Sequence, residues 1–192
     1  RSHEALRESR TALATSRKAE QLASRRAMHD QKTGLPNRTL FDDRLAQAIA
    51  GAERHGWALA VMFLDLDQFK AVNDTHGHAA GDTVLAIVAE RLLNHVRDED
   101  TVCRNGGDEF LYLLIDPSGR HHPPRSTRQP RTTLARPIAV TGLELAITPS
   151  IGIALYPDHG KTADVLVAHA DAAMYRSKQK RSPCEFYQPA GS

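Results

Sequence analysis

Four acidic residues stand where strands are predicted to end, and acids in such positions can bind cations. Asp65 and Asp67 close an almost continuous apolar run over residues 57–66, while Asp108 and Glu109 follow two glycines in a tight turn. If the strands that carry them are neighbours with facing ends, the carboxylates converge. Converging carboxylates suit a hard cation such as Mg²⁺, bound together with a nucleotide phosphate.

A single acid in a turn is most often an ordinary solvated residue, so the argument for a site depends on the surroundings. Asp65 would be costly to bury at the end of so apolar a strand unless it had a partner. Gly106 and Gly107 remove side chains where a ligand could approach the backbone. Both features favour a binding site.

The elements that carry these acids can be predicted from the apolar pattern. Residues 57–66 are typical of a strand buried on both faces at the centre of a sheet. Side chains alternate along a strand, so Asp65 and Asp67 lie on the same side of it. Residues 101–104 and 110–115 are predicted as two short strands that the glycine turn joins into a β-hairpin.

The remaining pattern places helices and strands in alternation, with hairpins among the strands. This arrangement indicates the α+β class with a mainly antiparallel sheet. Helices are expected over residues 1–30, 39–54, 82–96 and 162–180, a loop over 77–81, and strands over 143–148, 150–156 and 185–187.

Length and composition limit the class of protein. A chain of 192 residues allows one globular domain and an appendage. No run approaches the roughly 20 apolar residues of a membrane span, and the first residues lack a signal-peptide core. The two cysteines, Cys103 and Cys184, are too few for a disulfide framework. We therefore expect a cytoplasmic chain with no membrane contact in this stretch, and a net charge of +2 does not imply a nucleic-acid partner.

The N-terminal region is predicted to be a helical stalk, residues 1–28, that precedes a domain over residues 29–190. It is rich in Ala, Arg and Glu and has no Gly or Pro, and Leu6 and Leu13 are one heptad apart. One interpretation is a stalk that pairs with a copy of itself; the other is a solvated, partly frayed helix. A long polar helix needs a surface to pack on, which favours pairing.

The glycine turn also carries a recognisable motif. Residues 106–110 read GGDEF, and this sequence resembles the GGDEF family, the diguanylate cyclases. The opening residues 30–38 are similar to the family pattern D-x-L-T-G-L-P-N-R, with Lys32 in place of leucine.

Other segments extend the resemblance. Residues 65–82 match the family pattern D-x-D-x-F-K-x-x-N-D…G-H-x-x-G-D, and residues 150–154 and 170–178 match its C-terminal half. The resemblance covers residues 28–187, apart from the segment 117–133.

The resemblance implies a fold and a reaction. The fold is like the palm of class III nucleotide cyclases, with a five-stranded, mainly antiparallel central sheet flanked by helices. Two GTP molecules condense to cyclic di-GMP with loss of two pyrophosphates, in a homodimer whose two sites face each other. Attack of a 3′-hydroxyl on an α-phosphorus requires metal, and the expected cofactor is Mg²⁺ or Mn²⁺, two per active site. An upstream sensory domain is expected as a partner.

The resemblance also implies the catalytic residues. The Asp65 carboxylate, the Leu66 carbonyl and the Asp108 carboxylate would hold metal. Asp108 is favoured over Glu109 for deprotonating the 3′-hydroxyl, and Lys70 would stabilise the transition state.

The nucleotide would be held by side chains and by backbone. Asn73 and Asp82 would read the guanine edge, although Asn73 and His78 by themselves could equally be capping residues in loops. The implied substrate-binding residues are Gln68, Phe69, Asn73, His78, Asp82, Gly106, Gly107, Lys178 and Arg181.

Two features near the ends of helices concern phosphate and product. The family has K-x-x-G-R-N where this chain has Lys178 followed by Arg181 and Ser182, so Arg181 could replace the family arginine from one position earlier. Arg97 and Asp100 form an R-x-x-D placed as the family's inhibitory product site; by itself such a pair is a common solvated helix end. An Arg fork binds phosphate or guanine in bidentate fashion.

The segment 117–133 departs most from the family, which has an amphipathic helix there. It contains no apolar residue, and Pro123, Pro124 and Pro130 interrupt a helix. We expect no regular helix over 117–133 and a partly bare sheet face. The segment could instead be a basic arm for nucleic acid, but it lacks aromatic residues for base stacking.

Three functions remain open from the sequence. The leading one is a diguanylate cyclase with product inhibition. The second is a catalytically silent GGDEF domain that binds cyclic di-GMP as a receptor, and the third is a dimerising module that passes a signal through the stalk.

Overall fold

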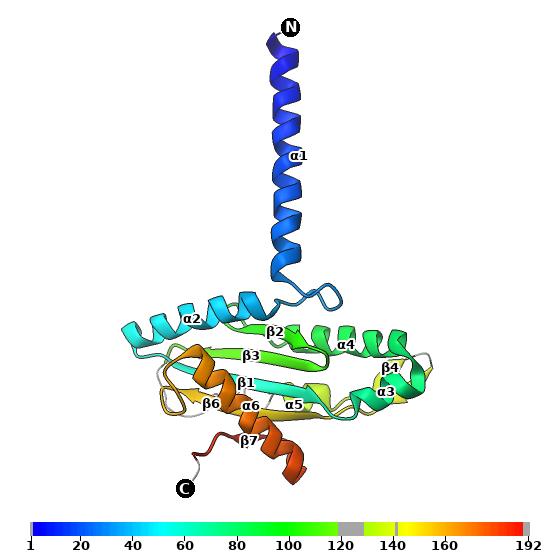
Figure 1. The fold of residues 1–192 in the computed structure, drawn as a ribbon, viewed down its shortest axis with the longest axis vertical. Helices are drawn as coiled ribbons and strands as arrows, with labels where there is room; N and C mark the ends of the chain where they lie inside the picture. Colours follow the sequence, from blue (N-terminus) through cyan, green and yellow to red (C-terminus); the bar gives the residue numbers. More distant parts are fainter. Residues whose placement is uncertain (1, 119–128, 141, 190–192) are drawn as a thin grey trace.

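The computed structural model describes residues 2–118, 129–140 and 142–189, and its centre is a five-stranded sheet in the order β2-β3-β1-β6-β7 (Figure 1). All neighbouring strands are antiparallel except β6 and β7. This arrangement confirms the predicted α+β class and the mainly antiparallel sheet. The strands are β1 (Ala58–Leu66), β2 (Thr101–Gly106), β3 (Glu109–Asp116), β6 (Pro149–Tyr156) and β7 (Glu185–Phe186).

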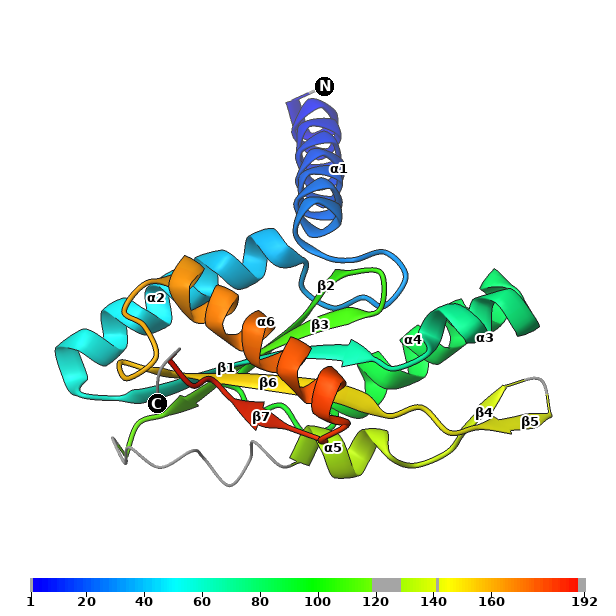
Figure 2. The same ribbon diagram turned by 60° about the horizontal axis from the view of Figure 1, so that its bottom comes forward.

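The central strand β1 is buried along its whole length, as predicted. Its side chains alternate between two cores. Met62 and Leu64 belong to the core under helix α4 (His78–Leu93), and Val61 and Phe63 belong to the core under helices α2 (Arg38–His55) and α6 (Ala163–Lys180). The sheet therefore lies between two helical layers (Figure 2), and Asp65 continues the face that α6 covers.

Local sequence explains where the helices begin and how closely they approach the sheet. Asn37 caps α2 by accepting a hydrogen bond from the Leu40 N–H at 3.1 Å. Thr162 caps α6 in the same way. Helix α6 crosses β6 at Gly152, where an added Cβ would lie 2.0 Å from the Ala170 carbonyl oxygen. Only glycine permits this contact, and it brings the C-terminal half of α6 over the sheet.

The segment after β1 differs from the prediction. Two helices, α3 (Phe69–His76) and α4, meet at Gly77, so the expected loop over 77–81 and the expected helix start at residue 82 are wrong. The sequence pattern missed α3 because only Phe69 in it is buried. Gly77 has φ +83° and its N–H donates to the Asn73 carbonyl, which ends α3 and lets α4 start at once.

The segment after β3 corrects a second expectation. Residues 129–134 form a short helix, α5 (Gln129–Leu134). The prediction that residues 117–133 contain no regular helix is therefore wrong for the C-terminal end of this segment. Residues 119–128 lie outside the described part of the chain. Pro130 is tolerated because it lies in the first turn. Leu134 is fully buried in the core under α4, so the sheet face is covered there and not bare.

The strand predicted over residues 143–148 is shorter in the structure. It is β5 (Leu143–Leu145), which pairs with β4 (Ile138–Val140) in a separate two-stranded sheet.

The N-terminal helix α1 (Ser2–Met28) projects away from the sheet (Figure 1). Its 27 residues span about 40 Å. Leu13 and Leu22 are 53% and 51% exposed in the single chain. Asn37 ties the base of α1 to the domain, since its Nδ2 donates to the Ala27 carbonyl at 2.7 Å. None of the helices in the described ranges is long and apolar enough to cross a membrane.

Candidate active site

The ends of β1 and β3 lie side by side and bring the predicted acids together. Asp65 is the register partner of Glu109, and the Leu66 N–H donates to the Asp108 carbonyl at 3.2 Å. Three carboxylates therefore share one edge of the sheet, as the facing strand ends predicted. The antiparallel register of two buried strands sets this arrangement.

Asp65 is almost completely buried, with 7% of its surface exposed, and it has a cationic partner. Lys178 Nζ lies 2.6 Å from Asp65 Oδ1. Burial raises the pKa of Asp65 above its usual value; the Lys178 hydrogen bond opposes the shift, and the charges of Asp108 and Glu109 add to it. The carboxylate thus sits in a cluster of acids that favours binding of a positive group.

The donor set at this edge fits a hard cation. Asp65, Asp108 and Glu109 offer carboxylate oxygens, the ligand type that Mg²⁺ prefers. The Asp108 amide makes no hydrogen bond to the Leu66 carbonyl within the described ranges, so that oxygen is open on the β3 side. No three His, Cys, Asp or Glu side chains of the described residues already form a metal cluster.

The glycine turn is held by a residue that the sequence interpretation missed, Arg104. Its Nε and Nη2 donate to the Gly107 carbonyl at 3.0 and 2.7 Å, and its Nη1 donates to both oxygens of Asp30 at 3.1 and 3.0 Å. Burial alone would raise the pKa of Asp30, but hydrogen bonds from Thr33 and Arg104 lower it below its usual value. The only signal in the sequence was that Arg104 comes two residues before the motif. Gly107 has φ +50°, which a side chain would disfavour.

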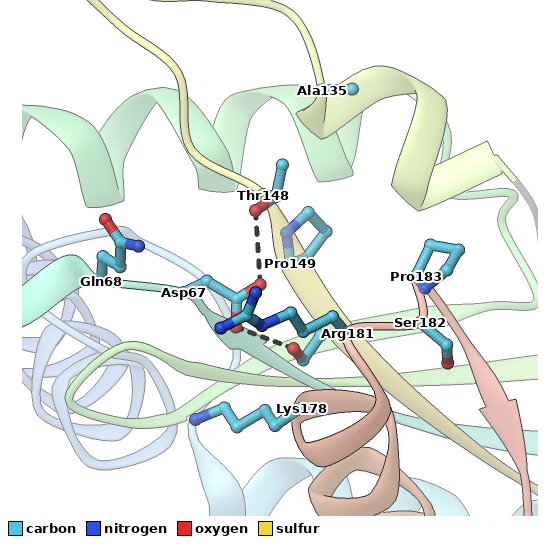
Figure 3. Close-up of a pocket in the computed structure, with 10 residues that line it drawn as sticks. Asp67, Gln68, Ala135, Thr148, Pro149, Lys178, Arg181, Ser182 and Pro183 are labelled. Atoms are coloured by element: carbon cyan, nitrogen blue, oxygen red, sulfur yellow. Dashed lines mark hydrogen bonds between the residues drawn. The ribbon is translucent and has the colours of Figure 1, made fainter.

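A pocket of about 740 Å³ lies next to this edge of the sheet, and Lys178, the partner of Asp65, is one of its lining residues (Figure 3). Lys178 and Arg181 extend into it from the end of α6, and Asp67 forms part of its wall (Figure 3). Ser150 Oγ donates to Asp67 at 2.7 Å, an interaction that the sequence interpretation did not single out. The other lining residues are Gln68, Ala135, Thr148, Pro149, Ser182 and Pro183.

The start of α3 borders the same pocket. Gln68 lines it and has φ +60°, which turns the chain sharply between β1 and α3. Phe69 is buried in the core and fixes the first turn of α3, while Lys70 is exposed. The first N–H groups of a helix lack partners within the helix and attract anions. This geometry fits the predicted backbone cradle for phosphate.

The predicted guanine-reading residues come together from α3 and α4. A Cβ on Gly81 would lie 2.0 Å from Asn73 Oδ1, so the absence of a side chain there makes room for Asn73. Asp82 follows directly and is paired with Lys32 Nζ at 2.6 Å. His78 is the first residue of α4 and is exposed.

The predicted product site lies apart on the turn before β2. Arg97 is exposed, whereas Asp100 is 5% exposed and accepts a hydrogen bond from the Ile115 N–H at 3.0 Å. Burial raises the pKa of Asp100 above its usual value. One oxygen of Asp100 is therefore already engaged by the backbone, and Arg97 is the accessible member of the pair.

Comparison with known proteins identifies the family. The family described as "Diguanylate cyclase, GGDEF domain" matches residues 27–183. The chain is 47% identical over 156 residues to the bifunctional diguanylate cyclase/cyclic di-GMP phosphodiesterase MucR of Pseudomonas aeruginosa, covering 80% of this chain and 22% of MucR. It is 43% identical to the diguanylate cyclase TpbB of the same species, covering 80% of this chain and 36% of TpbB. The chain thus spans well under half of these relatives.

Solved structures of GGDEF domains agree with this family assignment. The GGDEF domain of TpbB superposes with a TM-score of 0.79 at 40% identity and covers 83% of this chain and 94% of that domain. The coiled coil and GGDEF domain of DgcB from Caulobacter crescentus, solved with c-di-GMP, has a TM-score of 0.83 at 29% identity and covers 97% of this chain and all of that chain, 100%. Together with the GGDEF turn beside Asp65, these matches show that the chain belongs to the GGDEF family of diguanylate cyclase domains.

Proposed function

We propose that this domain is a diguanylate cyclase that condenses two GTP into cyclic di-GMP and two pyrophosphates. The observation that carries the proposal is the register of β1 against β3, which sets Asp65 against Glu109 next to a pocket lined by Lys178 and Arg181. Carboxylates for metal and cations for phosphate are the two requirements of phosphoryl transfer. Relatives named as diguanylate cyclases support the same reaction.

In this proposal Asp65, the Leu66 carbonyl and Asp108 hold Mg²⁺ or Mn²⁺, two ions per site. Bound metal would lower the pKa of the 3′-hydroxyl and neutralise phosphate charge. Side chains of the protein would remove the proton from the attacking hydroxyl. Asp108, with Glu109 as the alternative, takes the proton of the 3′-hydroxyl, whose oxygen then bonds to the α-phosphorus of the second GTP as pyrophosphate leaves.

The polyphosphate and the base are held by separate groups. The N–H groups at Gln68 and Phe69 and the charges of Lys70, Lys178 and Arg181 bind phosphate. Gly106 and Gly107 let the nucleotide approach the backbone. Guanine is read by Asn73 and Asp82 beside His78.

The reaction requires two copies of the chain, because one site holds one GTP. We propose that α1 pairs with α1 of a second copy and that an upstream sensory domain acts through it in the whole protein. The DgcB structure, which contains a coiled coil, supports this assignment, and so do the exposed Leu13 and Leu22. We further propose that product binds at Arg97 and Asp100 and inhibits the enzyme.

One observation favours a second function, a receptor for cyclic di-GMP without catalysis. Ser182 stands where the family pattern has arginine, which weakens the phosphate clamp unless Arg181 compensates. Arg181 lines the pocket, and this favours the cyclase.

Incubation with GTP and Mg²⁺, followed by chromatography, tests the proposal. The chain should form cyclic di-GMP, and Asp65→Asn or Asp108→Asn should abolish it while circular dichroism stays unchanged. Asp171→Asn, an exposed acid on α6, is the matched control and should retain activity. No product from the parent chain, together with cyclic di-GMP binding that Arg97→Ala weakens, would establish the receptor instead.

A further inference from the structure

An ion pair joins the opening turn of the domain to the predicted guanine site. Lys32 Nζ lies 2.6 Å from Asp82 Oδ1, although the two residues are 50 positions apart in the chain. Their side chains are 53% and 47% exposed, so a ligand can reach both. Lys32 is also the residue at which this chain departs from the family opening, where leucine stands. A leucine could make no such contact.

The backbone around Lys32 is held firmly, although its ammonium is on a flexible stem. Asp30 accepts hydrogen bonds from the Thr33 N–H at 2.9 Å and from Thr33 Oγ1 at 2.7 Å. The Asp30 N–H donates to the Leu35 carbonyl at 2.8 Å, and Leu35 is fully buried. Arg104 fixes Asp30 in turn. The ammonium can therefore pivot while its attachment point stays beside Asp82.

Asp82 has the chemistry to read part of guanine. The Watson–Crick edge of guanine presents two donors, N1–H and N2–H₂, and one acceptor, O6. A carboxylate accepts from both donors but repels O6 and offers it nothing. A polar atom left without a partner in a binding site weakens binding. A donor beside Asp82 would complete the set, and the Lys32 ammonium lies there in addition to the Asn73 amide.

We propose that Lys32 is a base-reading residue that moves from Asp82 to O6 of guanine when GTP binds. The inference rests on the proposed function, in which Asp82 reads the guanine edge. A lysine donor to O6 or N7 is an established way of recognising guanine. Exposed ion pairs are weak, so exchanging one oxygen partner for another costs little.

The same pair discriminates against adenine. Adenine carries a 6-amino donor where guanine has O6, so the Lys32 ammonium faces another donor. Its N1 is an acceptor and faces the Asp82 carboxylate. Both contacts become repulsive, which makes Lys32 and Asp82 a matched donor and acceptor set for guanine.

Equilibrium binding of three nucleotides tests the inference. The ligands are α,β-methylene triphosphates, which release no pyrophosphate, of guanosine, inosine and 2,6-diaminopurine riboside. Guanosine and inosine keep O6, while diaminopurine has an amino group there. Lys32→Leu should weaken guanosine and inosine binding by a similar factor, about ten-fold, and leave diaminopurine binding unchanged or tighter. Lys32→Arg should restore most of the affinity for guanosine.

Two controls separate the inference from the function that it extends. Lys161→Leu removes an exposed lysine beyond the opposite end of β6 and should change nothing. Asp82→Ala should weaken guanosine binding whether or not Lys32 contributes. If Asp82→Ala has this effect and Lys32→Leu leaves guanosine affinity unchanged, tightens it, or weakens all three nucleotides equally, the inference is overturned alone. If the parent chain binds none of them, the proposed function is overturned with it.

Discussion

Lys178 Nζ lies 2.6 Å from Asp65 Oδ1 and so links the predicted phosphate site on α6 to the predicted metal site on β1. Asp65 is on the face of β1 that α6 covers, because side chains alternate along the strand. A polyphosphate and a cation arriving together would each take one member of this pair. The ion pair keeps a buried carboxylate neutralised until then.

The first prediction concerns Lys178. Lys178→Met should raise the KM for GTP by roughly 10- to 100-fold, since a hydrogen bond to a charged group contributes about 1.5–3 kcal/mol. Steady-state kinetics would measure this. Lys180→Met is the matched control on the same helix, because Lys180 pairs with Glu185 at 3.1 Å outside the pocket lining. An unchanged KM in Lys178→Met would remove Lys178 from the phosphate site.

The second prediction concerns Arg181, which has φ +51° at the C-terminus of α6. A left-handed conformation costs a non-glycine residue roughly 1–2 kcal/mol. Arg181→Gly should therefore raise the melting temperature by a few degrees and at the same time weaken GTP binding. Arg181→Asn, which removes the charge but tolerates this conformation, should weaken binding to the same extent. Full GTP affinity in both variants would show that Arg181 does not replace the family arginine.

The third prediction separates Arg97 from Asp100. Arg97→Ala should weaken cyclic di-GMP binding without changing stability, because its side chain is exposed. Asp100→Ala should destabilise the fold by about 1–3 kcal/mol, since the Ile115 N–H loses its acceptor. Titration calorimetry and denaturant unfolding measure the two effects. Asp98→Ala, an exposed neighbour, is the control. Unchanged product affinity in Arg97→Ala would leave Arg97 an ordinary exposed residue before β2.

The fourth prediction concerns pH and His159, in the loop after β6. Its Nδ1 accepts a hydrogen bond from the Leu155 N–H at 3.0 Å, which requires an unprotonated nitrogen. The His159 ring also meets Tyr187 edge-on at 5.6 Å, close to the C-terminal end of the described chain. Burial lowers the pKa of His159 below its usual 6.5; Asp158 opposes this shift and His169 adds to it.

The lowered pKa of His159 determines how stability changes with pH. The unfolded chain binds the proton more readily than the folded one, so stability is present above pH 6.5 and decreases as the pH falls through the lower folded value. Thermal unfolding at about pH 7.5 and about pH 5.5 brackets this range. His159→Asn should show a smaller decrease than the parent chain, and His76→Asn, an exposed histidine, should not differ from it. An equal decrease in His159→Asn would assign the pH dependence to other groups.

Local patterns in the sequence determined the sheet and the acidic edge. The apolar run that contains Asp65 is typical of a strand buried on both faces, and the glycine turn before Asp108 predicts a hairpin. Once those two elements were neighbours, the acids had to meet. The GGDEF motif and its spacing to the other matching segments indicated the family, and both are visible in the sequence without a structure.

The tertiary structure decided the pairings between distant residues. Lys32 with Asp82, Arg104 with Asp30 and Lys178 with Asp65 are ion pairs whose members lie on different elements. The chain offers 25 Lys and Arg and 23 Asp and Glu, and no local pattern selects one partner among so many. Packing makes that selection, through the register of β1 against β3 and the close crossing of α6 at Gly152.

The helices around the substrate pocket also depended on packing. The sequence interpretation missed helices α3 and α5, because Phe69 is the one fully packed side chain of α3 and α5 adds Leu134 to the core. So little apolar surface leaves a weak periodic signal. Short helices of this kind are stabilised by the sheet that they cover, so their limits are set only when the core assembles.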